Sequence, residues 1–123
     1  MATNEKLITI SYPASADLSA DQYCIVKISS SQLALDATAG GATAFGILQN
    51  KPSAAGQAGE VAVGGVSKVI AGGTFSAGGK LTNDASGHAV AATTGDTILG
   101  IAIADGASGK VTSMLIDNGG VSA

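Results

Sequence analysis

The sequence has little of what most catalytic and ligand-binding sites are made from. Its 123 residues include no tryptophan, one cysteine, one histidine, two tyrosines and two phenylalanines. A single cysteine excludes an intramolecular disulfide and argues against a thiolate metal site. Four aromatic side chains cannot supply both a core and the stacking platforms that carbohydrate and single-stranded nucleic acid sites use. We therefore expect no metal, no cofactor and no small-molecule substrate.

Charge is also sparse, and apolar runs are short. Six lysines and no arginine against nine acids give a net charge of −3, and the lysines lie far apart in the sequence. They do not form a phosphate-binding stripe. The longest nearly uninterrupted apolar run, 98–104, falls far short of the roughly twenty residues of a membrane helix. The N-terminus lacks the basic start and long apolar segment of a signal peptide. We expect cytoplasmic synthesis, and binding to neither nucleic acid nor membrane.

What the sequence does contain is a series of short aliphatic runs bounded by Gly, Asn, Asp or Ser. Such runs predict strands joined by turn-length loops. The expected fold is all-β, a small β-barrel-like or sandwich domain with glycine-rich turns, one core and at most one short helical turn, at 17–22. Residues 1–15 form an N-terminal arm and first strand, and residues 16–123 a single β domain. The predicted strands are 7–12, 22–28, 44–48, 60–63, 66–70, 80–82, 89–91, 98–104 and 110–116.

Glycine pairs and strand alternation give further expectations. Gly-Gly pairs at 40–41, 64–65, 72–73, 78–79 and 119–120 lie at or beside predicted strand boundaries, where chain reversal favours positive φ. Residues 83–87 predict a hairpin loop with Gly87 in the left-handed region. In the second strand, alternation places Cys24, Val26 and Ile28 on the core face and Tyr23, Ile25 and Lys27 on a mixed face. Residues 37–48 also echo residues 91–102, which raises a duplicated β unit as a hypothesis beside chance.

Candidate chemical sites are few, and each has a structural interpretation that we prefer. His88 follows the loop that holds Asp84 and Ser86, a spacing too tight for a catalytic triad. Cys24 lies on an apolar face with no basic neighbour to lower its pKa, so we expect a buried thiol. Residues 78–82 resemble the end of a phosphate-binding loop but lack its first glycine and its following helix. Single acids indicate turn chemistry rather than a calcium site, at Asp84, Asp96, Asp105 and Asp117.

Four segments carry a resemblance to a known family. They are ADLSADQYCIVKIS (16–29), AFGILQNKPSAAGQAGEVAVGGVSKVIAGG (44–73), GKLTNDASGHAVAAT (79–93) and GDTILGIAIADGASGKVTSMLI (95–116). The chain resembles the small capsid decoration, or cement, proteins of tailed bacteriophages and prophages over nearly its whole length. The most specific part is residues 45–52, followed by the valine–glycine strands. This is a scaffold signature and transfers no catalytic residue.

The resemblance implies a compact β-barrel-like domain, a homotrimer, on the outer surface of the virion capsid. Its partner would be the major capsid protein, whose neighbouring subunits it would bridge. In related decoration proteins an N-terminal arm adds to the shell. Here the arm residues expected to contact the capsid are Ala2, Thr3, Asn4, Glu5 and Lys6. The strand that follows, 7–12, could pair with the edge of a capsid sheet.

Two other functional classes stay open at this point. The protein could be a phage-surface adhesion module that binds a host glycan or protein, which a glycan array or cell-binding assay would detect. It could also be a small enzyme, but no pair of acids, nucleophile with a base, or metal set can be assembled from the sequence. We therefore expect a non-enzymatic structural protein.

Overall fold

The structure, a computed structural model, describes residues 7–121, with side chains described as far as Ile116. This range contains β-strands and no helix. The strands are β1 (Leu7–Pro13), β2 (Ile25–Ser29), β3 (Gln32–Leu35), β4 (Gly46–Leu48), β5 (Ala58–Ile70), β6 (Lys80–Asn83), β7 (Ala89–Ala91), β8 (Thr97–Ala102) and β9 (Val111–Val121). The predicted all-β, barrel-like fold is confirmed.

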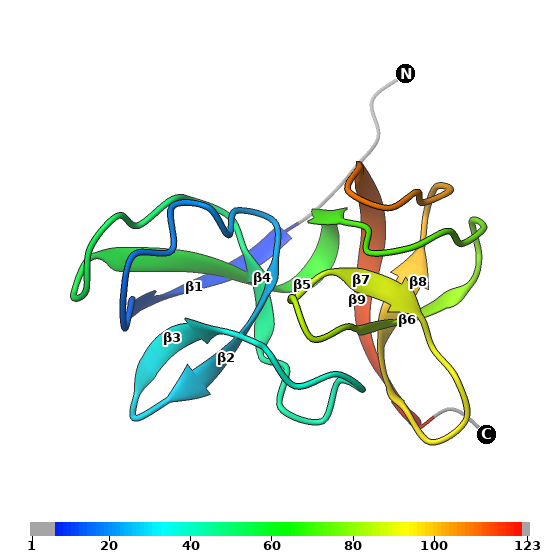
Figure 1. The fold of residues 1–123 in the computed structure, drawn as a ribbon, viewed down its shortest axis with the longest axis horizontal. Helices are drawn as coiled ribbons and strands as arrows, with labels where there is room; N and C mark the ends of the chain where they lie inside the picture. Colours follow the sequence, from blue (N-terminus) through cyan, green and yellow to red (C-terminus); the bar gives the residue numbers. More distant parts are fainter. Residues whose placement is uncertain (1–6, 122–123) are drawn as a thin grey trace.

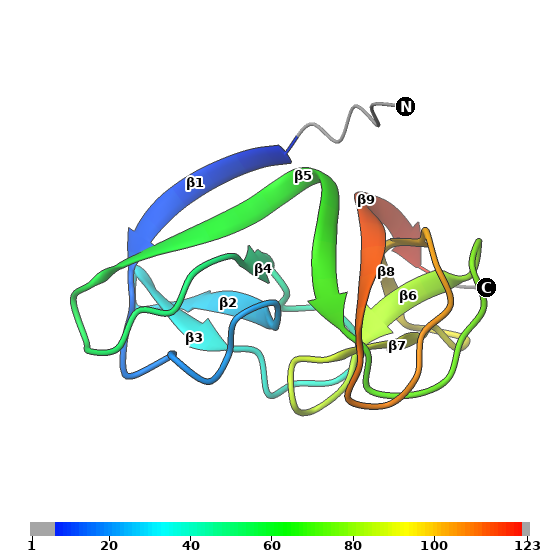
Figure 2. The same cartoon turned by 90° about the horizontal axis from the view of Figure 1, so that it is seen from above.

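All the described strands belong to one antiparallel sheet, which is curled into two halves. Its order is β3-β2-β4-β5-β9-β8-β6-β7, with β1 added to β5. Figure 1 shows β1 to β4 on one side of the molecule and β6 to β9 on the other. The long strand β5 runs from one half into the other, and it bends between them (Figure 2). We call residues 7–63 the N-terminal unit and residues 64–121 the C-terminal unit.

Three predicted elements differ from the structure. The predicted strands 60–63 and 66–70 form one strand, β5, because Gly64 and Gly65 bend it without ending it. Strand β3 was not predicted: it follows a tight turn in which Ser30 and Ser31 both have positive φ, where Asn and Gly are the usual signal. Residues 17–22 form turns rather than a helical turn, and the Asp17 carboxylate accepts from the Ser19 N–H and hydroxyl, which favours the turn.

The buried side chains form two clusters, where the sequence predicted one core. The smaller cluster fills the N-terminal unit and contains Val26, whereas the larger fills the C-terminal unit and contains Ile25. Ile28, expected on the core face, is exposed. Ile25, expected on the mixed face, is buried while Tyr23 and Lys27 are half-buried, so both faces at the start of β2 are covered. The reason is tertiary: the C-terminal unit packs against the outside of the N-terminal unit and covers the face that carries Ile25.

The two units repeat each other strand for strand. In the N-terminal unit β2 pairs with β3 and β4, and β4 pairs with β5; in the C-terminal unit β6 pairs with β7 and β8, and β8 pairs with β9. Strand β1 pairs with the first half of β5, and in the equivalent position of the C-terminal unit the second half of β5 pairs with β9. Cross-strand pairs of the N-terminal unit have equivalents in the C-terminal unit. Val26–Gly46 corresponds to Leu81–Gly100, Ile47–Ala62 to Ile101–Leu115, and Ala14–Leu33 to Ala71–Ala89.

The buried residues repeat in the same way. Each buried member of the smaller cluster has an equivalent in the larger one. The pairs are Ala14 and Ala71, Leu18 and Phe75, Val26 and Leu81, Leu33 and Ala89, Leu48 and Ala102, and Val61 and Met114. The sequence echo had already aligned Gly46 with Gly100, and these two residues occupy the same position in their units. The echo is therefore part of a structural duplication in which β5 ends the first unit and begins the second.

Candidate functional site

The arm predicted to contact the capsid, Ala2, Thr3, Asn4, Glu5 and Lys6, lies outside the described residues. The strand that follows it is β1, and it pairs with the protein's own β5 along one edge, from Leu7 opposite Gly65 to Pro13 opposite Ala58. No strand within residues 7–121 pairs with its other edge. An unpaired edge offers backbone N–H and C=O groups to another chain. One edge of β1 thus remains available for pairing.

Strand β1 is also exposed along its full length, although it carries apolar side chains. Exposed large apolar residues on it include Ile8, Ile10 and Tyr12. The Tyr12 ring stacks on Phe45 of the loop before β4, with ring centroids 5.9 Å apart and planes 12° apart. A row of exposed apolar side chains beside an open strand edge is typical of a surface that binds protein.

Cys24 is buried, as expected from the sequence. Burial raises the pKa of its thiol to about 11, and the nearby Asp21 and Asp84 carboxylates add to the shift. The reactive species is the thiolate. At neutral pH this side chain therefore acts as a small apolar group in the core.

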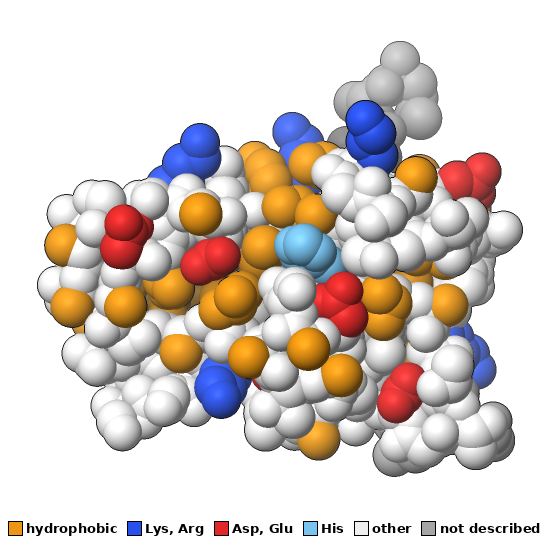
Figure 3. All heavy atoms as spheres, viewed as in Figure 1, with side chains coloured by type: hydrophobic (Ala, Val, Ile, Leu, Met, Phe, Trp, Pro, Cys, Tyr) orange, Lys and Arg blue, Asp and Glu red, His pale blue; other side chains and the backbone are white. Residues whose placement is uncertain are grey.

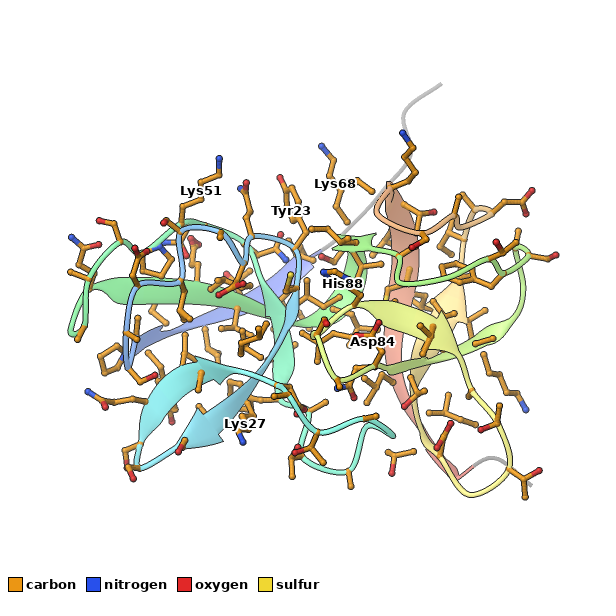
Figure 4. The ribbon with its side chains drawn as sticks, viewed as in Figure 1. Tyr23, Lys27, Lys51, Lys68, Asp84 and His88 are labelled. Atoms are coloured by element: carbon orange, nitrogen blue, oxygen red, sulfur yellow. The ribbon has the colours of Figure 1, made fainter. Side chains whose placement is uncertain are left out.

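The residues around His88 form a hairpin loop and not a triad. Gly87 has φ +75°, as predicted. The Asp84 carboxylate accepts hydrogen bonds from the backbone N–H groups of Ser86, at 2.8 Å, and of His88, at 3.0 Å. This oxygen is thus committed to the turn rather than to the His88 ring. Figure 4 shows both side chains where the two units meet.

The remaining candidates are turns, with two exceptions. Gly78 has φ +88° and the Gly79 N–H donates to the Ser76 carbonyl, so residues 78–82 enter β6 through a turn. Asp96 accepts from the Thr93 N–H of its own turn, but Asp105 accepts from the Ala77 N–H, 28 residues away, so it joins two loops rather than capping one turn. Asp117, predicted in a loop, lies in β9 because that strand runs on past Ile116. Among the described residues no three His, Cys, Asp or Glu side chains are placed to hold a metal ion.

One buried acid was not predicted. Asp36 is fully buried, and its carboxylate accepts from the Thr38 N–H and from the Thr43 hydroxyl. Nearby, the Asn83 side-chain amide donates to the Thr38 carbonyl at 3.0 Å. The Asp36 hydrogen bonds fix the conformation of the loop between β3 and β4, and the Asn83 hydrogen bond attaches that loop to the C-terminal unit. The spacing Asp36–Thr38 is typical of a side chain that caps its own turn, a signal the sequence did offer.

A shallow, open hollow of about 260 Å³ lies beside β1 and is lined by Ser11, Tyr12, Pro13, Gly56 and Ala58. The crevice between the units, lined by Ile25, Phe45 and Leu99 among others, has a volume of about 20 Å³, enough for about one water molecule. Figure 3 shows the basic side chains well apart, mostly toward the edges of this face, with acidic ones spread over it. Lys27 points away from the side that carries Lys51 and Lys68 (Figure 4). No helix in residues 7–121 is long and apolar enough to cross a membrane.

Fold and surface together define a class: a small all-β protein of two repeated units with an exposed, apolar edge strand. A family profile described as "Phage cement protein" matches residues 1–116. The chain therefore belongs to the phage cement protein family, which is structural and not known for enzymes. The fold is similar to that of the head fiber gp8.5 N base of bacteriophage phi29, with a TM-score of 0.70 and 18% identity over 96% of this chain and 100% of that chain. No curated protein matches.

Proposed function

We propose that this protein binds the outer surface of the assembled phage head and stabilises it by bridging neighbouring major capsid subunits, as a homotrimer. The observation that carries the proposal is the family match over residues 1–116. The phi29 head fiber fold and the exposed strand β1 with its free edge support it. The residues that would contact the shell are the arm residues Ala2, Thr3, Asn4, Glu5 and Lys6, which precede β1 directly.

The physical basis is linkage between binding and assembly. A ligand that binds the lattice but not free subunits stabilises each site by RT ln(1 + [L]/Kd), about 2.7 kcal/mol when the free ligand is at 100 times Kd. Every occupied site adds to the total. A trimer would strengthen attachment further, because its second and third arms bind intramolecularly once the first is placed. Such a role needs a defined shape rather than a reactive group.

The test uses heads that lack the protein. Purified protein should co-sediment with heads and raise the temperature at which they release DNA. A variant without residues 2–6 should bind more weakly while it keeps the melting temperature of the intact protein. If saturating protein neither sediments with heads nor changes their rupture temperature, the proposal is wrong. Binding to host cells or glycans without binding to heads would favour the adhesion module instead.

A further inference from the structure

The contact between the two units within one chain, which we call the seam, is built from the outer face of the N-terminal unit and the first strand of the C-terminal unit. Ile25 and Ile47 leave their own unit's core and join the cluster that contains Val69. Beside them the Gln49 side-chain amide donates to the Ser67 hydroxyl at 2.8 Å. The seam therefore has an apolar centre with a polar pair next to it.

Because the units are equivalent, each side of the seam has a counterpart elsewhere on the molecule. Strand β1 is the counterpart of the second half of β5. Ile10 of β1 pairs with Val61, and Ser67 of β5 pairs with Met114, which is the equivalent of Val61. Strand β8 is the counterpart of β4. The counterparts of Ser67 and Val69 are Ile10 and Tyr12, and those of Ile25, Ile47 and Gln49 are Lys80, Ile101 and Ile103.

Burial at these positions differs sharply between the units. Ser67 and Val69 are 3% and 0% exposed, whereas their counterparts Ile10 and Tyr12 are 37% and 42% exposed. The reason is that the N-terminal unit covers the second half of β5, while no described residue takes that place over β1. Ile103, the counterpart of Gln49, is 51% exposed. The chain thus carries the two surfaces that a second seam would need, β1 on the N-terminal unit and the outer face of the C-terminal unit, and within the described residues they do not meet.

We propose that a second copy of this chain makes that seam: the outer face of the C-terminal unit of one copy covers β1 of the next. The polar pair Gln49–Ser67 of the first seam is replaced by Ile103 and Ile10, an apolar pair. Apart from Lys80, the counterpart of Ile25, the side chains at the two patches are apolar, as an interface between copies requires. The contact is head-to-tail, so repeated contacts close into a ring when the rotation between copies allows it.

One detail of the seam is not repeated. The Ile70 N–H donates to the Tyr23 carbonyl within the chain, but the counterpart of Ile70 is Pro13, which has no N–H. Contact between copies therefore rests on side chains. Ile103 and Ile10 take the place of the polar pair, and Tyr12, Ile101 and Lys80 take the place of the apolar centre. This inference deepens the homotrimer of the proposed function by naming the surfaces that would join it.

The experiment measures the mass of the intact protein by sedimentation over a range of concentrations. We expect the unaltered protein to associate, and Ile10→Asp and Ile103→Asp each to weaken association by about 100-fold or more, because each places a carboxylate in the apolar contact between Ile10 and Ile103. The matched control is Val111→Asp. Val111 is 53% exposed and its counterpart, Ala58, lies outside the seam, so this variant should associate normally. Thermal melts verify that all variants fold.

A double variant tests whether the two side chains face each other. In the Ile10→Asp, Ile103→Lys protein a carboxylate of one copy would meet an ammonium of the next, so association should recover relative to either single variant. A monomeric unaltered protein, association that survives both aspartate variants, or a double variant no better than the singles would each overturn the inference. Head binding is measured separately: binding by a monomer would leave the capsid-binding part of the proposed function standing without its homotrimer, and association without head binding would leave only the seam.

Discussion

Replacing Gly46 or Gly100 by alanine tests the duplication at its tightest point. Gly46 of β4 lies against the backbone of β5, and Gly100 of β8 lies against the backbone of β9. A Cβ added at Gly46 would lie 2.5 Å from the Ala62 carbonyl oxygen and 2.5 Å from a Val61 methyl group. A Cβ at Gly100 would clash with the Leu115 carbonyl oxygen and the Met114 methyl group.

The expected loss of stability depends on which of the contacted atoms can move away from the added Cβ. The methyl groups of Val61 and Met114 can rotate away, but the carbonyl oxygens belong to sheet backbone that is paired on both sides. Relief therefore requires the strands to separate, and overpacking of this kind costs about 3 kcal/mol. For a domain of this size that corresponds to a fall in Tm of about 10 °C. Because the two positions are equivalent, we expect similar losses at both.

The assay is thermal and urea unfolding followed by circular dichroism. The matched control is Gly73→Ala, since a Cβ there meets only a Val90 methyl group, at 3.9 Å. Its φ is not in the left-handed region, so alanine should be neutral or add about 0.5 kcal/mol by reducing the entropy of the unfolded chain. If Gly46→Ala or Gly100→Ala unfolds at the same temperature as Gly73→Ala, the close approach of the strands is not real.

Three further predictions concern buried and titrating groups. Cys24 should resist thiol reagents at about pH 8 in the native protein and react after unfolding, because burial raises its pKa to about 11; fast native labelling would contradict its burial. Asp36→Ala should cost about 2 kcal/mol in urea unfolding, since it leaves the Thr38 N–H and the Thr43 hydroxyl without their acceptor; a neutral result would show that these bonds contribute nothing. Burial raises the pKa of Asp21 above its ordinary 3.8, with repulsion from Asp17 adding to the shift. The ionised form is thus disfavoured on folding, so the stability Asp21 contributes is full below that ordinary value and is lost as pH rises through the raised pKa. Asp21→Asn should therefore gain on the unaltered protein as pH rises, and parallel stability profiles would refute this.

The identities of most strands could be read from the sequence because each is a short aliphatic run with turn residues at its ends. Strand β3 could not, since its turn uses Ser30 and Ser31 in place of Asn and Gly. Nor could the continuity of β5, because Gly64 and Gly65 can bend a strand as well as end it. The burial of Cys24 was also readable, because alternation along its strand places it on the apolar face.

Composition and local pattern determined by themselves that the chain would be all-β, rich in tight turns and poor in reactive groups. Those properties depend on each residue and its close neighbours in sequence. Only the tertiary structure decided that the echo in the sequence is a repeated unit, that Ile25 and Ile47 serve the other unit's core, and that β1 keeps an uncovered face. These depend on which strands pair and which surfaces meet over long separations, and alternation along a single strand cannot encode what will lie against it.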